Sequence, residues 1–199
     1  MGKKELRKEL ITKRDSLSNG EWKELSDSIQ RTIIRSGIYN TADCILCYAD
    51  YHNEVGTYVL IDDAILKGKE VYVPKVLEDF SYSCMQFYRI FSSTELIDGY
   101  KGIKEPVGNK KYEFDYEKNK SKNVLMLVPG VGFDSDNNRM GYGKGYYDTY
   151  LKDKPTIKKC GLCFDIQYTD EIPHDLNDIK MDFVVTEKTK ITNLNKIRF

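Results

Sequence analysis

The sequence predicts an α/β fold, in which helices cover the faces of a mostly parallel sheet. Helical and strand patterns alternate along most of the chain. A continuous apolar strand at Cys44–Ala49, an amphipathic helix and a second strand at Val71–Val73 form a βαβ unit, whose crossover makes the two strands parallel. A length of 199 residues suits one sizeable core, so we expect a single domain over residues 1–199.

The first elements are expected to be two helices. The first runs from Lys3 to about Leu17 and places four residues near one face: Leu6, Leu10, Arg14 and Leu17. Ser18 and Glu21 form a capping-box pattern that begins a second helix, which we expect to reach Gly37. Its expected buried stripe is Trp22, Leu25, Ile29 and Ile33.

The later elements follow from shorter patterns. Thr57 is expected to cap the helix of the βαβ unit, which stops at Gly68 and carries Leu60, Ile61, Ala64 and Ile65. Further strands are predicted at Met85–Ile90, Val124–Val128, Lys159–Phe164 and Phe183–Thr186, with a short helix from about Tyr146 to Leu151. Residues 98–123 lack a regular period, which indicates a surface loop or flap.

Charge and hydropathy exclude several classes of partner. The 31 basic side chains equal the 31 acidic ones, so no net field favours nucleic acid or an anionic membrane. The N-terminal segment lacks the apolar core of a secretory signal, and no window is long enough to span a membrane. We therefore expect a cytoplasmic protein, acting as a monomer on a small molecule.

Two CxxC pairs, Cys44/Cys47 and Cys160/Cys163, superficially resemble zinc or redox sites. Both lie in short apolar runs that read as strands, where residues three apart point to opposite faces. The two members of a pair then cannot bind one metal ion, and reduced core cysteines are expected.

A glycine-rich loop follows the predicted strand Val124–Val128, where ligands of parallel sheets usually bind. Its sequence is RMGYGKGYYD, from Arg139 to Asp148, preceded by PGVGFD. Glycines at 141, 143 and 145 would let the backbone take conformations closed to other residues and bring its amides close to an anion, and Arg139 and Lys144 would add charge. The spacing matches neither a Walker A motif nor GxGxxG, so a tight surface turn is the alternative.

The run RMGYGKGYYD resembles the signature loop of the 5-formyltetrahydrofolate cyclo-ligase family, also called methenyltetrahydrofolate synthetases. Other segments resemble the family in the same order: KKELRKEL, NEVGTYVLIDDAILKGKEVYVPKV, GIKEPV and IPHDLNDIKMDFVVTE. The resemblance covers nearly the whole chain. It implies a three-layer fold similar to sugar-phosphate isomerases and CoA transferases.

The resemblance also implies site residues. The ATP-binding set is Lys3, Lys4, Glu5, Leu6, Arg7, Arg139, Met140, Gly141, Tyr142, Gly143, Lys144, Gly145, Tyr146 and Tyr147. The folate-binding set is Ala49, Glu54, Tyr142, Gly143, Lys144, Gly145 and Tyr146. Without the resemblance, the N-terminal basic residues would read as a solvated helix face, Glu54 as an ordinary loop acid and the tyrosines as core packing.

The implied cofactors are ATP and Mg²⁺, with Asp148 and Asp178 resembling the magnesium ligands. Asp182 is the alternative to Asp178, because many relatives carry Glu and His where this chain has Asp175 and Asn177. By itself each Asp would read as a helix cap or turn residue.

The implied reaction is ATP-dependent cyclisation of 5-formyltetrahydrofolate, whether or not polyglutamylated, to 5,10-methenyltetrahydrofolate with release of ADP and phosphate. The expected catalytic residues are Arg139, Lys144 and Tyr146, while His52 and His174 are assigned no chemistry. Phosphoryl transfer needs positioned charge rather than a protein nucleophile. The alternatives are an enzyme resembling sugar-phosphate isomerases and a non-catalytic module that binds nucleotide or folate.

Overall fold

A six-stranded sheet forms the centre of the computed structural model, which describes residues 2–78 and 83–199. The strand order is β11-β9-β6-β1-β2-β3. These strands are β1 (Cys44–Leu46), β2 (Glu70–Glu78), β3 (Ser83–Ile90), β6 (Val124–Pro129), β9 (Lys158–Leu162) and β11 (Phe183–Val185). All neighbours are parallel except β2 and β3, which form an antiparallel hairpin. The predicted α/β class with a mostly parallel sheet is confirmed.

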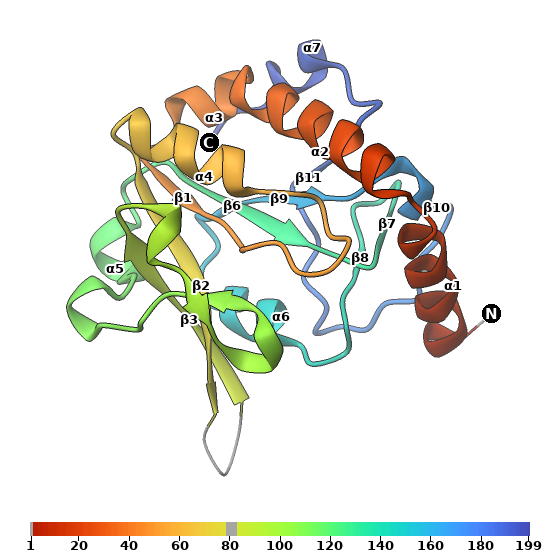
Figure 1. Cartoon of the computed structure of the whole chain (residues 1–199), viewed down its shortest axis with the longest axis horizontal. Helices are drawn as coiled ribbons and strands as arrows, with labels where there is room; N and C mark the ends of the chain where they lie inside the picture. The colour runs from red at the N-terminus through yellow and green to blue at the C-terminus, as the bar shows by residue number, and fades with distance from the viewer. Residues whose placement is uncertain (1, 79–82) are drawn as a thin grey trace.

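Helices lie on both faces of this sheet (Figure 1), and apolar side chains pack against each face. On one face lie α2 (Asn19–Ile34), α3 (Gly37–Thr41), α4 (Tyr58–Leu66) and α7 (Ile191–Leu194). On the other lie α6 (Tyr146–Leu151) and α5 (Tyr116–Asn119). The helix α1 (Lys3–Asp15) lies beside the sheet and packs on the 3-10 turn η4 (Asp165–Gln167).

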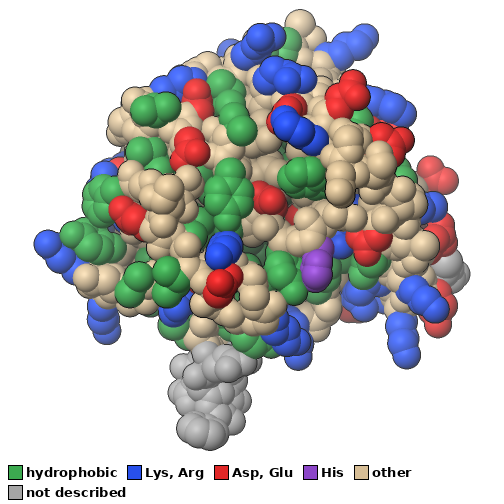
Figure 2. All heavy atoms as spheres, viewed as in Figure 1, with side chains coloured by type: hydrophobic (Ala, Val, Ile, Leu, Met, Phe, Trp, Pro, Cys, Tyr) green, Lys and Arg blue, Asp and Glu red, His purple; other side chains and the backbone are tan. Residues whose placement is uncertain are grey.

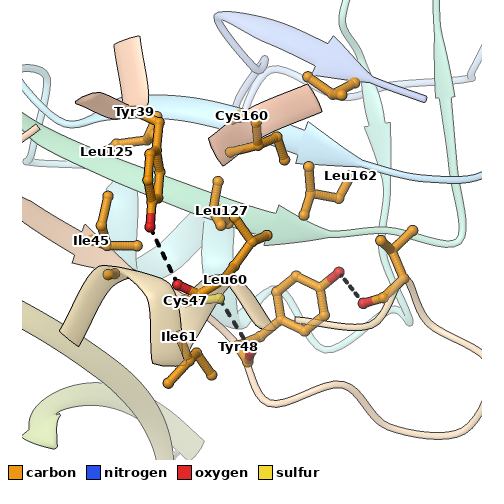
Figure 3. Close-up of a cluster of buried hydrophobic side chains, with 14 of the residues drawn as sticks. Tyr39, Ile45, Cys47, Tyr48, Leu60, Ile61, Leu125, Leu127, Cys160 and Leu162 are labelled. Carbon is orange, nitrogen blue, oxygen red and sulfur yellow. Dashed lines mark hydrogen bonds between the residues drawn. The ribbon is translucent and has the colours of Figure 1, made fainter. Parts of the chain in front are cut away.

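Strand alternation divides the apolar side chains of each strand between two cores. Ile45 and Cys47 pack in the core that contains α2 to α4 (Figure 3), whereas Cys44 and Leu46 belong to the core on the other face, which contains α6. Cys160 and Cys163 are likewise divided between the two cores. The prediction that the members of each CxxC pair point to opposite faces is confirmed.

Several element boundaries differ from the prediction. The second helix ends at Ile34 rather than Gly37, because Ser36 accepts a hydrogen bond from the Tyr39 amide and caps a separate helix, α3. Cys44–Leu46 is shorter than predicted, although the chain stays buried through Ala49. The helix α4 begins after Thr57 as predicted, but the Thr57 hydroxyl bonds the Tyr48 carbonyl and Asp50 instead of capping.

The segment predicted as a loop or flap is ordered by short elements and local contacts. It contains η2 (Tyr100–Gly102), β5 (Lys104–Glu105), η3 (Lys110–Tyr112) and α5, and β5 pairs with β4 (Ile97–Asp98). Phe114 and Glu105 within the segment are buried, so the segment is part of the folded body.

The remaining short elements lie outside this segment. They are η1 (Ser93–Glu95), β7 (Gly132–Asp134), β8 (Arg139–Met140) and β10 (Tyr168–Thr169).

Charges of both signs are interspersed on the face shown in Figure 2, as the balanced composition predicts. Within residues 2–78 and 83–199, none of the helices is long and apolar enough to cross a membrane.

Candidate active site

A cavity of about 680 Å³ opens at the carboxyl ends of the central strands. Ala49, just after β1, and Pro129, the last residue of β6, lie on its wall, as expected for a ligand site of a parallel sheet. The glycine-rich loop and the N-terminal helix line one side of the cavity. The β2–β3 hairpin and the segment from η2 to β5 line another side with apolar residues: Pro74, Val76, Met85, Tyr100 and Ile103.

A buried carboxylate fixes the base of the glycine-rich loop. Asp134 is 1% exposed and accepts hydrogen bonds from the amides of Asp136, Asn138 and Ile172 and from the Asn138 side chain. These contacts hold the β7–β8 turn against the segment that leads to Asp178. The loop thereby starts from a rigid support.

Two of the three loop glycines adopt a positive-φ backbone conformation that favours glycine. Gly143 and Gly145 have φ of +90° and +68°, which side-chain-bearing residues rarely adopt. Gly141 does not have a positive φ, so the expectation of unusual backbone at all three is wrong there. A Cβ at Gly141 would instead lie 2.7 Å from Arg139 Nη1, so close packing explains this glycine.

Apolar packing brings α1 to the loop. Leu10 is 1% exposed, and a Cβ added to Gly132 would collide with the Leu10 side chain. Arg7 Nε donates to the Gly141 carbonyl at 2.9 Å. The helix therefore presents Lys3 and Arg7 at the same cavity wall as the loop, although about 130 residues separate them in the chain.

A hydrogen bond to the backbone beside Asp178 brings the two candidate metal ligands, Asp148 and Asp178, close together. Asp148 Oδ1 accepts from the amide of Ile179, the residue after Asp178, at 3.1 Å. Asp148 Oδ2 lies 2.8 Å from Arg139 Nη2, and Asp178 Oδ2 lies 2.9 Å from Lys3 Nζ. Although partial burial opposes it, the Asp175 amide and Lys3 hold the pKa of Asp178 below its ordinary value.

This pair fits a magnesium ion that arrives with phosphate. Mg²⁺ usually takes one or two protein carboxylates and fills its remaining positions with phosphate oxygens and water. In the described part of the chain, no three His, Cys, Asp or Glu side chains are grouped for a metal ion, so a closed protein cage is not formed there. Asp182 lies outside the cavity lining and pairs with Lys159 at 2.8 Å, which favours Asp178.

Arg139 sits under the loop as a buried cation. Its side chain is 6% exposed, and its guanidinium lies 5.4 Å from the centre of the Tyr147 ring. Its buried Nε finds no hydrogen-bond acceptor among the described residues. Lys144, by contrast, is exposed at the cavity mouth and can turn toward a ligand.

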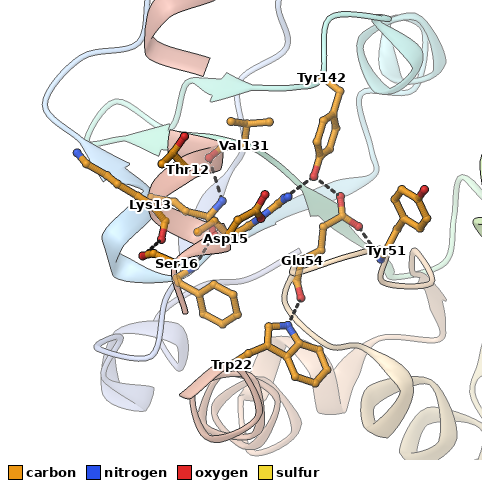
Figure 4. A network of polar contacts seen from close by, with 12 residues as sticks. Thr12, Lys13, Asp15, Ser16, Trp22, Tyr51, Glu54, Val131 and Tyr142 are labelled. Atoms are coloured by element: carbon orange, nitrogen blue, oxygen red, sulfur yellow. Dashed lines mark hydrogen bonds and ion pairs between the residues drawn. The ribbon is translucent and has the colours of Figure 1, made fainter. Parts of the chain in front are cut away.

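Glu54 is a buried acid on the same cavity wall as Tyr142 (Figure 4). Its Oε1 accepts from the Tyr142 hydroxyl at 2.8 Å, and its Oε2 accepts from the Tyr51 amide at 3.1 Å. Burial raises the pKa of Glu54 to about 7, against these hydrogen bonds, which lower it. The group can therefore change charge near neutral pH.

Most residues singled out in the sequence lie on this one cavity. Lys3, Arg7, Ala49, Glu54, Asp178 and all of residues 139–148 line it. Lys4, Glu5 and Leu6 do not: Lys4 and Glu5 are exposed, and Leu6 is 5% exposed in the apolar contact between α1 and the loop.

The sequence did not reveal the apolar wall of the cavity or the roles of the side chains of His52 and Arg14. His52, to which no chemistry was assigned, lines the cavity, whereas His174 contacts the Ile172 carbonyl. Arg14 is buried beside Tyr142, and its signal was present in the sequence as an arginine on the apolar face of the first helix. The wall residues gave no such signal, because Pro, Val and Met read as ordinary strand positions.

Comparison with known proteins gives concordant results. Residues 1–187 match the model of the 5-formyltetrahydrofolate cyclo-ligase family. A mouse 5-formyltetrahydrofolate cyclo-ligase is 33% identical over 194 residues, which are 93% of each chain. The solved 5,10-methenyltetrahydrofolate synthetase of Aquifex aeolicus has a TM-score of 0.79 and 33% identity, covering 95% of this chain and 91% of its own. The solved 5,10-methenyltetrahydrofolate synthetase of Mycoplasma pneumoniae has a TM-score of 0.73 and 25% identity, covering 94% of this chain and 100% of its own.

Proposed function

The chain belongs to the 5-formyltetrahydrofolate cyclo-ligase family, and we propose that it converts 5-formyltetrahydrofolate to 5,10-methenyltetrahydrofolate with consumption of ATP. One observation carries the proposal. A single cavity joins an apolar wall, which suits a flat ring system, to a glycine-rich loop flanked by Lys3, Arg7 and Arg139, which suits polyphosphate.

The reaction needs activation of an amide oxygen. The formyl group on N5 is an amide, so its oxygen leaves poorly when N10 attacks the formyl carbon. Transfer of the γ-phosphoryl group of ATP to that oxygen gives an N5-iminium phosphate. N10 then attacks the carbon and loses its proton, the C–O bond breaks, and the oxygen departs with phosphate to leave the methenyl bridge.

The residues of the cavity would act by binding and positioning. Backbone amides of the loop at Gly143 and Gly145 would face the phosphates, and Arg7 and Lys144 would neutralise their charge. Arg139 would hold Asp148 in place through their 2.8 Å contact. Glu54 would accept hydrogen bonds from N–H donors of the folate ring, and Tyr146 would pack against the folate at the reacting end.

Asp148 and Asp178 would hold a magnesium ion, which would supply charge neutralisation for the phosphates of ATP. Lys3 pairs with Asp175 at 2.6 Å and with Asp178 at 2.9 Å, and its ammonium group would add positive charge for the phosphates.

An assay of ADP release tests the proposal against its alternatives. Purified protein should release ADP only when ATP, Mg²⁺ and 5-formyltetrahydrofolate are all present, and methenyltetrahydrofolate should form in equal amount. Full turnover in excess EDTA would contradict the metal requirement. Isomerisation of a sugar phosphate without ATP would favour the isomerase alternative, and binding of ATP or folate without ADP release would favour a non-catalytic module.

A further inference from the structure

Arg14 is a buried arginine on the apolar face of α1. Its side chain is 4% exposed, in line with Leu6 and Leu10, which pack the helix onto the rest of the protein. Its Nε donates to Asp15 Oδ1 at 3.1 Å, and Asp15 is 46% exposed. That partner alone does not explain the buried position, because an exposed arginine could pair with Asp15 equally well.

The other end of Arg14 crosses to the glycine-rich loop. Nη1 donates to the Tyr142 hydroxyl at 2.5 Å, and that hydroxyl donates in turn to Glu54 Oε1 at 2.8 Å. Figure 4 shows Tyr142 and Glu54 meeting at this point, with Tyr51 on the other side of the carboxylate. A buried cation is thus linked through one hydroxyl to a buried carboxylate at the cavity wall.

We propose that Arg14 is a positioning residue for the candidate active site, which acts through the Tyr142 hydroxyl to keep the Glu54 carboxylate ionised and fixed at the cavity wall. That Glu54 binds folate rests on the proposed function, whereas the contacts from Arg14 through Tyr142 to Glu54 are present in the ligand-free protein. Arg14 lines no part of the cavity and would not touch substrate.

Electrostatics gives the link its direction. Burial favours the neutral form of Glu54, whereas the Tyr142 hydroxyl, the Tyr51 amide and the charge of Arg14 favour the ionised form. A hydroxyl that accepts from a guanidinium becomes a stronger donor to a carboxylate. Loss of Arg14 should therefore weaken both contributions and shift Glu54 toward its protonated form at neutral pH.

Other groups around Glu54 do not replace this cation. The titratable and charged groups that face it are Arg14 from α1, Tyr142 from the loop, Tyr147 from α6, and Tyr48, Asp50, Tyr51 and His52 around its own loop. Burial raises the pKa of Tyr48, Tyr142 and Tyr147, so these tyrosines stay neutral. Asp50 opposes ionisation of Glu54.

The only tryptophan of the chain offers a direct probe. Trp22 Nε1 donates to the Glu54 carbonyl at 2.7 Å (Figure 4). Tryptophan fluorescence of the ligand-free protein, titrated with pH, should show a midpoint near the Glu54 pKa of about 7. The step should disappear in Glu54→Gln, and a step that persists there belongs to another group and overturns the proposal.

Substitutions along the link then decide its role. Arg14→Gln should raise the midpoint by about one pH unit, and Arg14→Lys, which keeps the charge, should raise it less. Tyr142→Phe should also raise it, and Arg14→Gln should add little in that background, because both changes break one link. Lys13→Gln is the matched control, since Lys13 is the next residue and pairs only with exposed Glu9 among its described contacts; it should leave the midpoint unchanged.

The enzymatic readout separates positioning from general structural support. Arg14→Gln should raise the folate KM several-fold, with the largest effect at low pH, and leave the ATP KM nearly unchanged. Folded Arg14→Gln with an unshifted midpoint, or equal changes in both KM values, would overturn the proposal. If Arg14→Gln fails to fold, Tyr142→Phe decides by the same midpoint. If the protein releases no ADP with folate, the proposed function fails while the fluorescence result still stands.

Discussion

Glu54 makes the stability of the folded protein depend on pH, and the direction of that dependence follows from its pKa. Its ordinary pKa is 4.5, and burial raises the folded value to about 7. Below pH 4.5 the Glu54 carboxyl group is protonated in both the folded and the unfolded chain. Between the two values the folded chain holds a proton that the unfolded chain has released, so stability falls as pH rises and the loss is complete above 7.

We therefore expect the wild-type free energy of unfolding to fall relative to that of Glu54→Gln by on the order of 3 kcal/mol between pH 4.5 and 7.5. Urea unfolding of the two proteins at matched pH values measures this difference. Taking the difference cancels groups that titrate alike in both. A difference that rises with pH would contradict the raised pKa.

The two cations of the glycine-rich loop should behave differently when removed. Arg139 is 6% exposed and pairs with Asp148, so Arg139→Ala should lower the free energy of unfolding by about 1–3 kcal/mol and raise the ATP KM. Lys144 is exposed, so Lys144→Ala should raise the ATP KM and change stability by less than about 0.5 kcal/mol. Unfolding curves and initial rates separate the two effects. Similar stability losses in both variants would contradict this division.

The sequence predicted the site residues whose type and spacing suit few functions. Arg139, Lys144 and Asp148 stood out because charges among alternating glycines suit few purposes besides anion binding, and all three line the cavity. Arg14 was recognised as part of a helix face, but its partner could not be foreseen. The contact to Tyr142 joins residues 128 positions apart and depends on how α1 docks.

At the scale of elements, the loop glycines provide a clean contrast. Gly145 has φ of +68°, and nothing lies within 4 Å of a Cβ built on it, so Gly145→Ala suffers only from backbone strain. Gly20 is equally open but lies in the helix α2. We expect Gly145→Ala to destabilise by about 1 kcal/mol and Gly20→Ala to stabilise by up to about 1 kcal/mol.

Thermal or urea unfolding of both variants checks this pair of opposite signs. Gly145→Ala should in addition raise the ATP KM, because Gly145 precedes the first residue of α6 and sets the direction in which the loop leaves. An unchanged stability of Gly145→Ala would mean that the loop takes another conformation in solution.

Elements with local signals were predicted better than those made by long-range pairing. The capping box of Ser18 and Glu21 and the bounds of Tyr146–Leu151 are as predicted, because capping and helical period are local. The β2–β3 hairpin is longer than predicted. Its eight paired positions extend past Pro74, a residue that reads as a strand end but is tolerated within this pairing.

At the scale of the whole molecule, four distant stretches of chain assemble the cavity beside the wall formed by the β2–β3 hairpin and residues 100–105. They are the N-terminal helix, the loop after β1, the glycine-rich loop and the segment around Asp178. Parallel strands bring the second and third together, and that could be predicted from the βαβ pattern. The docking of α1 and the position of Asp178 depend on specific contacts, such as Leu10 against Gly132 and the Ile179 amide on Asp148.

Assembly of two distant carboxylates leads to a prediction about metal binding. If Asp148 and Asp178 bind one Mg²⁺ with the ATP phosphates, Asp148→Asn and Asp178→Asn should each weaken it, because an amide oxygen lacks the carboxylate charge. Each variant should need more Mg²⁺ for half-maximal rate. The double variant should lose less than the two single losses summed, since both residues act on one ion.

Asp182→Asn is the matched control for this experiment. Asp182 lies a few residues beyond Asp178 but pairs with Lys159 outside the cavity lining, so its Mg²⁺ titration should overlay that of the parent protein. Magnesium-dependent binding of a non-hydrolysable ATP analogue, followed calorimetrically, should rank the variants in the same order without turnover. A titration of Asp178→Asn that overlays the parent's would remove Asp178 from the metal site. A weakened Asp182→Asn would move the second ligand there, and would require the chain around residues 178–182 to rearrange when ATP binds.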